Sequence, residues 1–173
     1  NVPIVTEESL GTNPTNSPRQ EVFQFIESSI LDNIDLLPET SSKYTLNQTS
    51  AKAILAKLYL NAEVYTGTAR WADAEAMADE VINSGQYSLS TNFFANFSER
   101  NSGSTENILT LPYDQDNAGG FNLAQMTLHY ANQNTYNLQE QPWNGYTSLE
   151  EFYNSFDDED VRKNSFLVGP QFA

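Results

Sequence analysis

The chain is 173 residues long, and its 23 acidic side chains outnumber the eight basic ones, which gives a formal net charge of -15 at pH 7. A field of this sign repels phosphate backbones and anionic lipid headgroups, so the charge argues against direct binding to nucleic acid or to a membrane surface. The sequence has no cysteine, which excludes a disulfide scaffold and a thiolate metal site. No apolar run approaches the roughly 20 residues that span a bilayer.

The first predicted helix follows a polar loop at residues 1–16. Ser17 is placed to cap this helix, Pro18 fits its first position, and Gln20 would complete a capping box. The apolar residues that follow recur at helical spacing: Val22, Phe25, Ile26, Ile30, Ile34 and Leu37. Pro38 ends the pattern, so one helix is predicted between Pro18 and Leu37.

The strongest pattern lies between Thr49 and Ser90 and predicts two amphipathic helices joined by a tight turn. The first apolar face consists of Ala51, Ile54, Leu55, Leu58, Tyr59, Ala62 and Tyr65. The second consists of Trp71, Ala74, Met77, Ala78, Val81 and Ile82. Gly67 and Gly85 follow the two faces, where a glycine can adopt the left-handed conformation that ends a helix. A connection this short places the helices antiparallel and adjacent, as in a tetratricopeptide hairpin.

The match to the tetratricopeptide consensus is partial, because the spacing between the two halves is longer and no proline closes the unit. A generic helical hairpin therefore stays open as the alternative. In either case one hairpin cannot bury its own apolar face, so it is expected to stack on further helices.

Beyond Gly85 the helical periodicity fades. Residues 108–111 are the best strand candidate, and residues 114–144 form a long irregular stretch rich in Asn and Gln, of a kind that is often functional. Ser148 and Glu151 form a capping box before a short amphipathic helix. The sequence as a whole predicts a mainly α fold of tetratricopeptide-like helical hairpins, with long irregular loops and a little β. It predicts one domain with three segments: a helical scaffold (18–85), a loop-rich region expected to bind the ligand (86–147), and a short helix with an acidic segment (148–173).

The same segments resemble the SusD/RagB family. The resemblance rests on residues 51–60 (AKAILAKLYL), 71–74 (WADA) and 80–89 (EVINSGQYSL), and it extends to residues 22–27 (VFQFIE), 35–38 (DLLP), 105–109 (TENIL) and 152–162 (FYNSFDDEDVR). No single piece is a strict signature, but their order and spacing are specific to this family.

The resemblance implies a cell-surface glycan-binding lipoprotein of Bacteroidetes that works without catalysis. It implies surface exposure at the outer membrane and a SusC-like TonB-dependent outer-membrane transporter as the partner for uptake. The family is considerably longer than this chain, so the chain is expected to be a fragment. Its membrane attachment would be through a lipid anchor outside the chain.

The candidate binding residues lie in the irregular stretch, where aromatic side chains alternate with amides. Aromatic rings stack on the C–H faces of neutral sugars, and amides hydrogen-bond the hydroxyls. Pro142 and Gly145 can hold a turn that presents an indole outward. The predicted ligand-binding residues are Trp143, Asn144, Tyr146 and Tyr136. For Trp143 one alternative stays open, namely that it is a core anchor under a long loop. The neighbouring aromatic residue Tyr130 is expected to lie in the core.

The segment that begins at Asp114 has alternating oxygen ligands followed by glycines, which suggests a structural calcium site with Asp114 and Asp116 as ligands. The glutamate at EF-hand spacing is absent, and an Asx-rich turn is the alternative.

A catalytic interpretation has little support in the sequence. The single histidine, His129, is expected to be a hydrogen-bonded structural residue, and no nucleophile or metal-protease motif is found. A dispersed carboxylate pair, as in glycosidases, ranks last among three hypotheses. Glycan capture ranks first, and a helical scaffold for protein–protein contacts ranks second.

Overall fold

The computed structural model describes residues 2–9, 11–98, 101–112 and 123–171. In these residues the chain is mainly helical and forms no sheet, which confirms the predicted fold class. Its contacts divide it into two compact units, Asn1–Leu111 and Pro112–Ala173. Within the described part of the chain, no helix is both long and apolar enough to cross a membrane.

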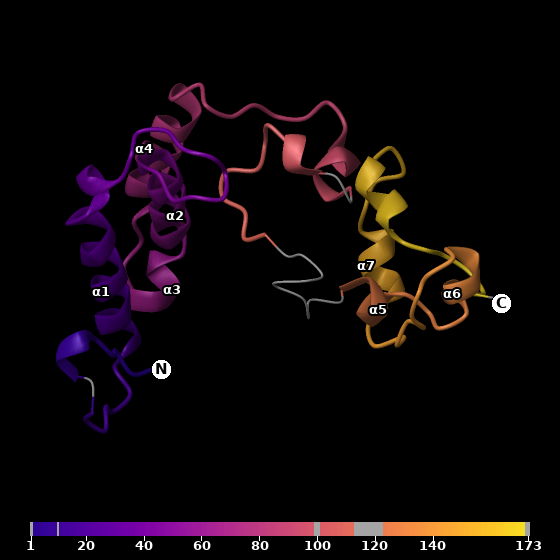
Figure 1. The fold of residues 1–173 in the computed structure, drawn as a ribbon, viewed down its shortest axis with the longest axis horizontal. Helices are drawn as coiled ribbons and strands as arrows, with labels where there is room; N and C mark the ends of the chain where they lie inside the picture. Colours follow the sequence, from indigo (N-terminus) through magenta and orange to yellow (C-terminus); the bar gives the residue numbers. More distant parts are fainter. Residues whose placement is uncertain (1, 10, 99–100, 113–122, 172–173) are drawn as a thin grey trace. The chain divides into compact units, whose positions relative to one another are not determined.

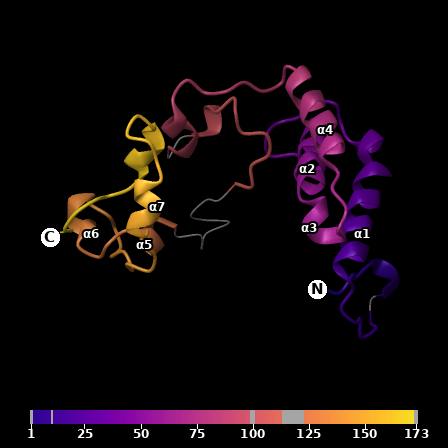
Figure 2. The same cartoon turned by 180° about the vertical axis from the view of Figure 1, so that it is seen from behind.

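The described residues of the first unit form four α-helices, which are labelled in Figure 1. They are α1 (Arg19–Leu31), α2 (Gln48–Leu60), α3 (Ala62–Thr66) and α4 (Trp71–Asn83). Helices α2 and α4 pack along each other, and α1 lies against α2 and α3, as both views show (Figures 1 and 2). Four short 3-10 helices accompany them: Glu7–Ser9, Ile34–Leu36, Phe93–Phe97 and Asn101–Gly103.

The core of this unit is small and lies where α1, α2 and α4 meet. Its buried members come from the predicted faces at helical spacing and from α1: Phe23, Leu55, Tyr59, Ala62 and Ala74. Ile30, Leu58 and Met77 pack against this cluster. The alanines keep the helices close, since a methyl group adds little to the distance between axes. The predicted helical hairpin is therefore confirmed, with α2 and α4 as its arms.

Several helix ends follow their local chemistry. The Asn47 side chain accepts a hydrogen bond from the Ser50 backbone N–H at 2.7 Å, and the Ser50 hydroxyl accepts one from the Asn47 N–H at 2.8 Å. This reciprocal capping box starts α2. Gly67 and Gly85 have φ angles of 80° and 64°, the left-handed conformation predicted after each arm.

Three local predictions for this unit are wrong. Ser17 does not cap α1; its backbone N–H instead bonds the Val2 carbonyl at 3.0 Å in an isolated antiparallel bridge. The first arm breaks at Asn61, whose side-chain amide donates to the Lys57 carbonyl at 2.9 Å and so competes with the backbone helix bond. The first helix likewise ends at Leu31, six residues before the predicted Leu37.

The predicted strand at residues 108–111 is also not formed. The Thr110 N–H bonds the Lys43 carbonyl at 2.8 Å, but Lys43 lies in a loop. A strand needs a ladder of such bonds to a neighbouring strand. The apolar run therefore remains irregular.

The described residues of the second unit form three short α-helices, α5 (Leu123–Thr127), α6 (Asn132–Thr135) and α7 (Glu150–Asn154), and a 3-10 helix at Val161–Ser165. The predicted amphipathic helix corresponds to α7, although Ser148 makes no capping bond. Four aromatic rings gather on this segment, with centroid separations of 5.3 to 6.0 Å: Phe152, Tyr153, Phe156 and Phe166. Three of these ring pairs are edge-to-face, a geometry that stabilises by more than the buried area alone.

Candidate ligand-binding loop

The predicted binding residues Trp143, Asn144 and Tyr146 lie on one loop that is attached to α5 by its backbone. Four consecutive N–H groups donate to carbonyls at the end of α5. Trp143 bonds Gln125 at 2.5 Å, Asn144 bonds Leu128 at 3.0 Å, and Gly145 and Tyr146 both bond Met126, at 2.8 and 2.9 Å. We call these four bonds the α5 clamp. The last carbonyls of a helix have no partner inside it, so the loop satisfies acceptors that α5 leaves open.

The local sequence explains why the loop can lie so close. Pro142 is buried, so the chain enters the loop from a fixed position. Asn144 has a φ of 50°, a left-handed conformation that Asn tolerates better than most residues. At Gly145 an added Cβ would lie 3.2 Å from the Met126 carbonyl oxygen, so a glycine permits this approach. The backbone forms no regular turn over residues 141–149, so the predicted turn around Pro142 and Gly145 is not found, and the α5 clamp holds the loop instead.

The aromatic side chains of this loop face solvent. Trp143 is 54% exposed and Tyr146 is 62% exposed, although their backbones are held by the clamp. The interpretation of Trp143 as a core anchor does not match this exposure. Tyr136, which ends α6, is 48% exposed. Tyr130 is 52% exposed, so its predicted place in the core is wrong.

The polar anchor of this unit is Asn132, which the sequence reasoning did not single out. It is 3% exposed; its Oδ1 accepts from the His129 backbone N–H at 3.0 Å, and its Nδ2 donates to the Gln171 side chain at 3.0 Å. The His129 ring accepts the Ala131 N–H through Nδ1 at 3.1 Å, which fits a structural role for this histidine. Nothing in the sequence marks Asn132 among the many amides of this stretch.

The two aspartates predicted to hold calcium, Asp114 and Asp116, lie outside the described residues. Within the described ranges, no three His, Asp or Glu side chains come close enough together to hold a metal ion.

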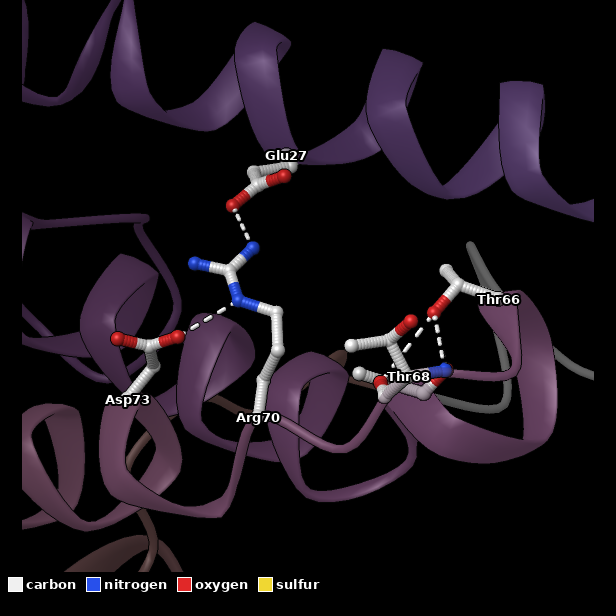
Figure 3. A network of polar contacts seen from close by, with 6 residues as sticks. Glu27, Thr66, Thr68, Arg70 and Asp73 are labelled. Atoms are coloured by element: carbon white, nitrogen blue, oxygen red, sulfur yellow. Dashed lines mark hydrogen bonds and ion pairs between the residues drawn. The ribbon is translucent and has the colours of Figure 1, made fainter.

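A second polar cluster lies in the first unit, where Arg70 links α1 to the start of α4 (Figure 3). Arg70, just before α4, pairs with Glu27 of α1 and bonds Asp73 at 2.6 Å. Its guanidinium carbon lies 4.1 Å from the centroid of the Tyr59 ring. Burial opposes the charge of Arg70, but the hydrogen bonds to Asp73 and Glu27 hold its pKa above the ordinary value. Burial raises the pKa of Tyr59 as well, helped by a hydrogen bond to Glu27.

This cluster has the character of a structural element. Arg70 bonds two carboxylates of its own unit, and its guanidinium lies over a ring of the core. Two hollows also lie in the first unit: a polar one of about 390 Å³ that includes Lys52 and Glu80, and an apolar one of about 210 Å³ that includes Phe23 and Leu58. None of the predicted binding residues lines either hollow.

Comparison with solved structures gives a match over nearly the whole chain. A crystal structure of a SusD superfamily protein from Bacteroides fragilis superimposes with a TM-score of 0.74 and 18% sequence identity, covering 95% of this chain and 38% of that one. The chain has a SusD-like fold. It therefore spans about 38% of the length of the SusD superfamily protein that it matches. No family model matches the sequence, and no curated protein matches it.

The match confirms the resemblance seen in the sequence at the level of the fold. The helical hairpin that carried the resemblance is present as α2 and α4, and the irregular region that follows is part of the matched length. A SusD-like fold supplies a helical support with long loops, and loops on such a support commonly carry function.

Proposed function

We propose that this chain captures oligosaccharide at the cell surface, without cleaving it, for uptake through a partner TonB-dependent outer-membrane transporter. The observation that supports this function is the exposure of the Trp143 indole on a loop fixed by the α5 clamp. An indole that faces solvent on a loop held in place offers its flat face for stacking on the C–H face of a sugar ring.

The clamp adds a second argument for binding. A loop already held in one conformation loses little entropy when a ligand binds, so a preorganised platform binds more tightly than a mobile one. In our proposal Trp143 and Tyr146 stack on sugar rings, Asn144 hydrogen-bonds hydroxyls, and Tyr136 contributes a further ring. All four side chains are exposed.

The remaining parts of the proposal concern attachment and ions. A lipid anchor outside this chain would hold the protein at the outer surface of the outer membrane. The net charge of -15 would keep it in solution and away from anionic headgroups. Calcium bound at Asp114 and Asp116 would have a structural role.

Isothermal titration calorimetry on the full-length protein with a panel of neutral oligosaccharides tests this function. We expect binding without release of reducing sugar. Trp143→Ala should weaken it at least about tenfold, which is about 1.4 kcal/mol and within the range of an aromatic hot spot.

The chain provides its own control, because its other tryptophan, Trp71, is 62% exposed and lies on α4 in the first unit. Trp71→Ala should leave the affinity unchanged. If both variants lose the same glycan affinity, or if Trp143→Ala loses none, Trp143 is not part of the binding site. Absence of binding to every glycan would refute the function.

The second candidate function is a scaffold for protein–protein contacts. It is favoured by large apolar side chains that the hairpin helices leave exposed: Leu60, Val64, Trp71 and Ile82. A protein that binds peptide and does not respond to glycans in the same calorimetric assay would support this alternative.

A further inference from the structure

The loop that carries the proposed binding residues also contains the only Asn–Gly pair in the sequence, Asn144–Gly145. The Asn144 side chain is exposed to solvent. An asparagine followed by glycine is the pair most open to attack by its own backbone, because no side chain shields the following nitrogen.

The reaction consumes no cofactor. The Gly145 backbone nitrogen attacks the Asn144 Cγ; a new C–N bond forms, the Cγ–Nδ2 bond breaks, and the Gly145 N–H proton leaves with Nδ2 as ammonia through solvent. Water then opens the resulting succinimide at one of its two carbonyls. Opening gives either aspartate or isoaspartate, and in both cases a neutral amide has become a carboxylate.

The α5 clamp opposes the first step. The attacking nitrogen is the Gly145 N–H, which donates to the Met126 carbonyl at 2.8 Å. The flanking N–H groups of Asn144 and Tyr146 are also bonded, so the backbone cannot turn toward the Asn144 side chain while the clamp is closed. The reaction therefore requires a local opening, and its rate falls in proportion to the population of the open loop.

The residue that makes the pair labile cannot easily be replaced. An added Cβ at position 145 would lie 3.2 Å from the Met126 oxygen, closer than most Cβ contacts, so the short clamp bond depends on glycine. The same absence of a side chain permits both the close backbone approach and the chemical attack. The fold thus carries its own reactive pair and the hydrogen bonds that restrain it.

We propose that Asn144–Gly145 is a site of spontaneous deamidation, and that the α5 clamp holds its rate in the folded protein below the rate in the unfolded chain. The product places a new carboxylate between Trp143 and Tyr146, on a chain that already has a charge of -15. The modification does not depend on glycan binding.

The test compares the folded protein with the same protein unfolded in guanidinium chloride, both at mildly alkaline pH. Peptide mapping by mass spectrometry follows the replacement of the Asn144 amide by a carboxyl group, and enzymatic methylation detects isoaspartate. We expect conversion in both samples, with the folded protein slower by at least about tenfold, the factor that follows from an opening free energy of about 1.4 kcal/mol.

Two controls make the result decisive. In the unfolded sample Asn144 should convert faster than Asn83, which is followed by Ser84, and Asn144→Gln should remove the signal at this position because its longer side chain would have to close a larger ring. Conversion at Asn144 no faster than at Asn83 in the unfolded chain would overturn the site. Equal rates in the folded and unfolded protein would overturn the role of the clamp. Titration with glycans does not measure either of these rates. The proposal of deamidation and the proposal of glycan capture can therefore be refuted separately.

Discussion

Different interactions stabilise the inside of each of the two units of this chain. In the first unit, long helices bury a continuous apolar cluster that includes Leu55 and Tyr59. In the second, the described helices have five residues or fewer, and local groups of contacts hold the loops: the four bonds of the α5 clamp, the buried Asn132 and the aromatic rings around Phe166. Burial along a helix gives a rigid support, whereas clamped loops leave aromatic side chains such as Trp143 exposed. In this chain packed helices supply a buried core, and hydrogen bonds fix loops that have little core of their own.

The largest expected effect tests the apolar core of the first unit. Leu55 is fully buried, so Leu55→Ala should lower the free energy of unfolding by about 2–5 kcal/mol through lost burial and a cavity. Chemical denaturation followed by circular dichroism measures the change. Leu60→Ala, on the same helix but 62% exposed, should change it by less than about 0.5 kcal/mol. Equal effects would mean that α2 is not held by this cluster.

The next effect tests the polar anchor of the second unit. Asn132→Ala leaves the His129 N–H and the Gln171 side chain without their partner. The free energy of unfolding should therefore fall by about 1–3 kcal/mol. Hydrogen exchange of the amides at residues 129–146 should speed up, while exchange in α2 and α4 stays unchanged. Asn134→Ala, an exposed amide on the same helix, is the control. No change in exchange at Asn132→Ala would show that the unit does not depend on this contact.

A smaller effect is expected at alkaline pH from Tyr59. Because the pKa of Tyr59 is raised by burial, and then by Glu27, its neutral form is favoured in the folded state. The stability that this provides is fully present below the ordinary pKa of 10.0 and is lost as the pH rises through the folded value. Denaturation midpoints above pH 10.0 should therefore fall less steeply in Tyr59→Phe than in the wild type. Tyr65→Phe, 43% exposed, should follow the wild type.

The smallest effect is expected at the surface of the second unit, where Asp160 bonds the side chain and backbone N–H of Arg162. The hydrogen bond from the Arg162 side chain, followed by its backbone N–H, lowers the pKa of Asp160. The stability that the ionised Asp160 carboxylate gives to the folded state is present above pH 3.8, its ordinary pKa. This stability is lost as the pH falls through the lower pKa that Asp160 has in the folded protein. A carboxyl titration by NMR should show the Asp160 pKa rise toward 3.8 in Arg162→Gln. High salt should shrink the difference between the two proteins; a titration curve that Arg162→Gln leaves unmoved would contradict this pairing.

The sequence by itself determined the helical hairpin and the SusD-like fold. The spacing of Ala51, Leu55 and Tyr59 places three apolar side chains on one face of α2, and burial of that face is the dominant local energy term. Gly67 and Gly85 ended the arms as predicted, since a left-handed residue after a helix is a local preference. The aromatic and amide composition of residues 130–146 also directed attention to the loop that the structure holds on α5.

Only the tertiary structure decided the contacts that depend on a distant partner. Ser17 makes no cap because α1 begins at Arg19 and Pro18 occupies the capping position, while the Ser17 backbone N–H bonds the distant Val2 carbonyl. Residues 108–111 formed no strand because Lys43 supplied one bond without a ladder. The clamp and the burial of Asn132 depend on which carbonyls and side chains lie nearby in the folded chain. Every residue has the same backbone carbonyl, so the sequence does not identify the one that accepts the bond. Such partners leave no mark in the local sequence, because their energy comes from groups brought together only when the chain has folded.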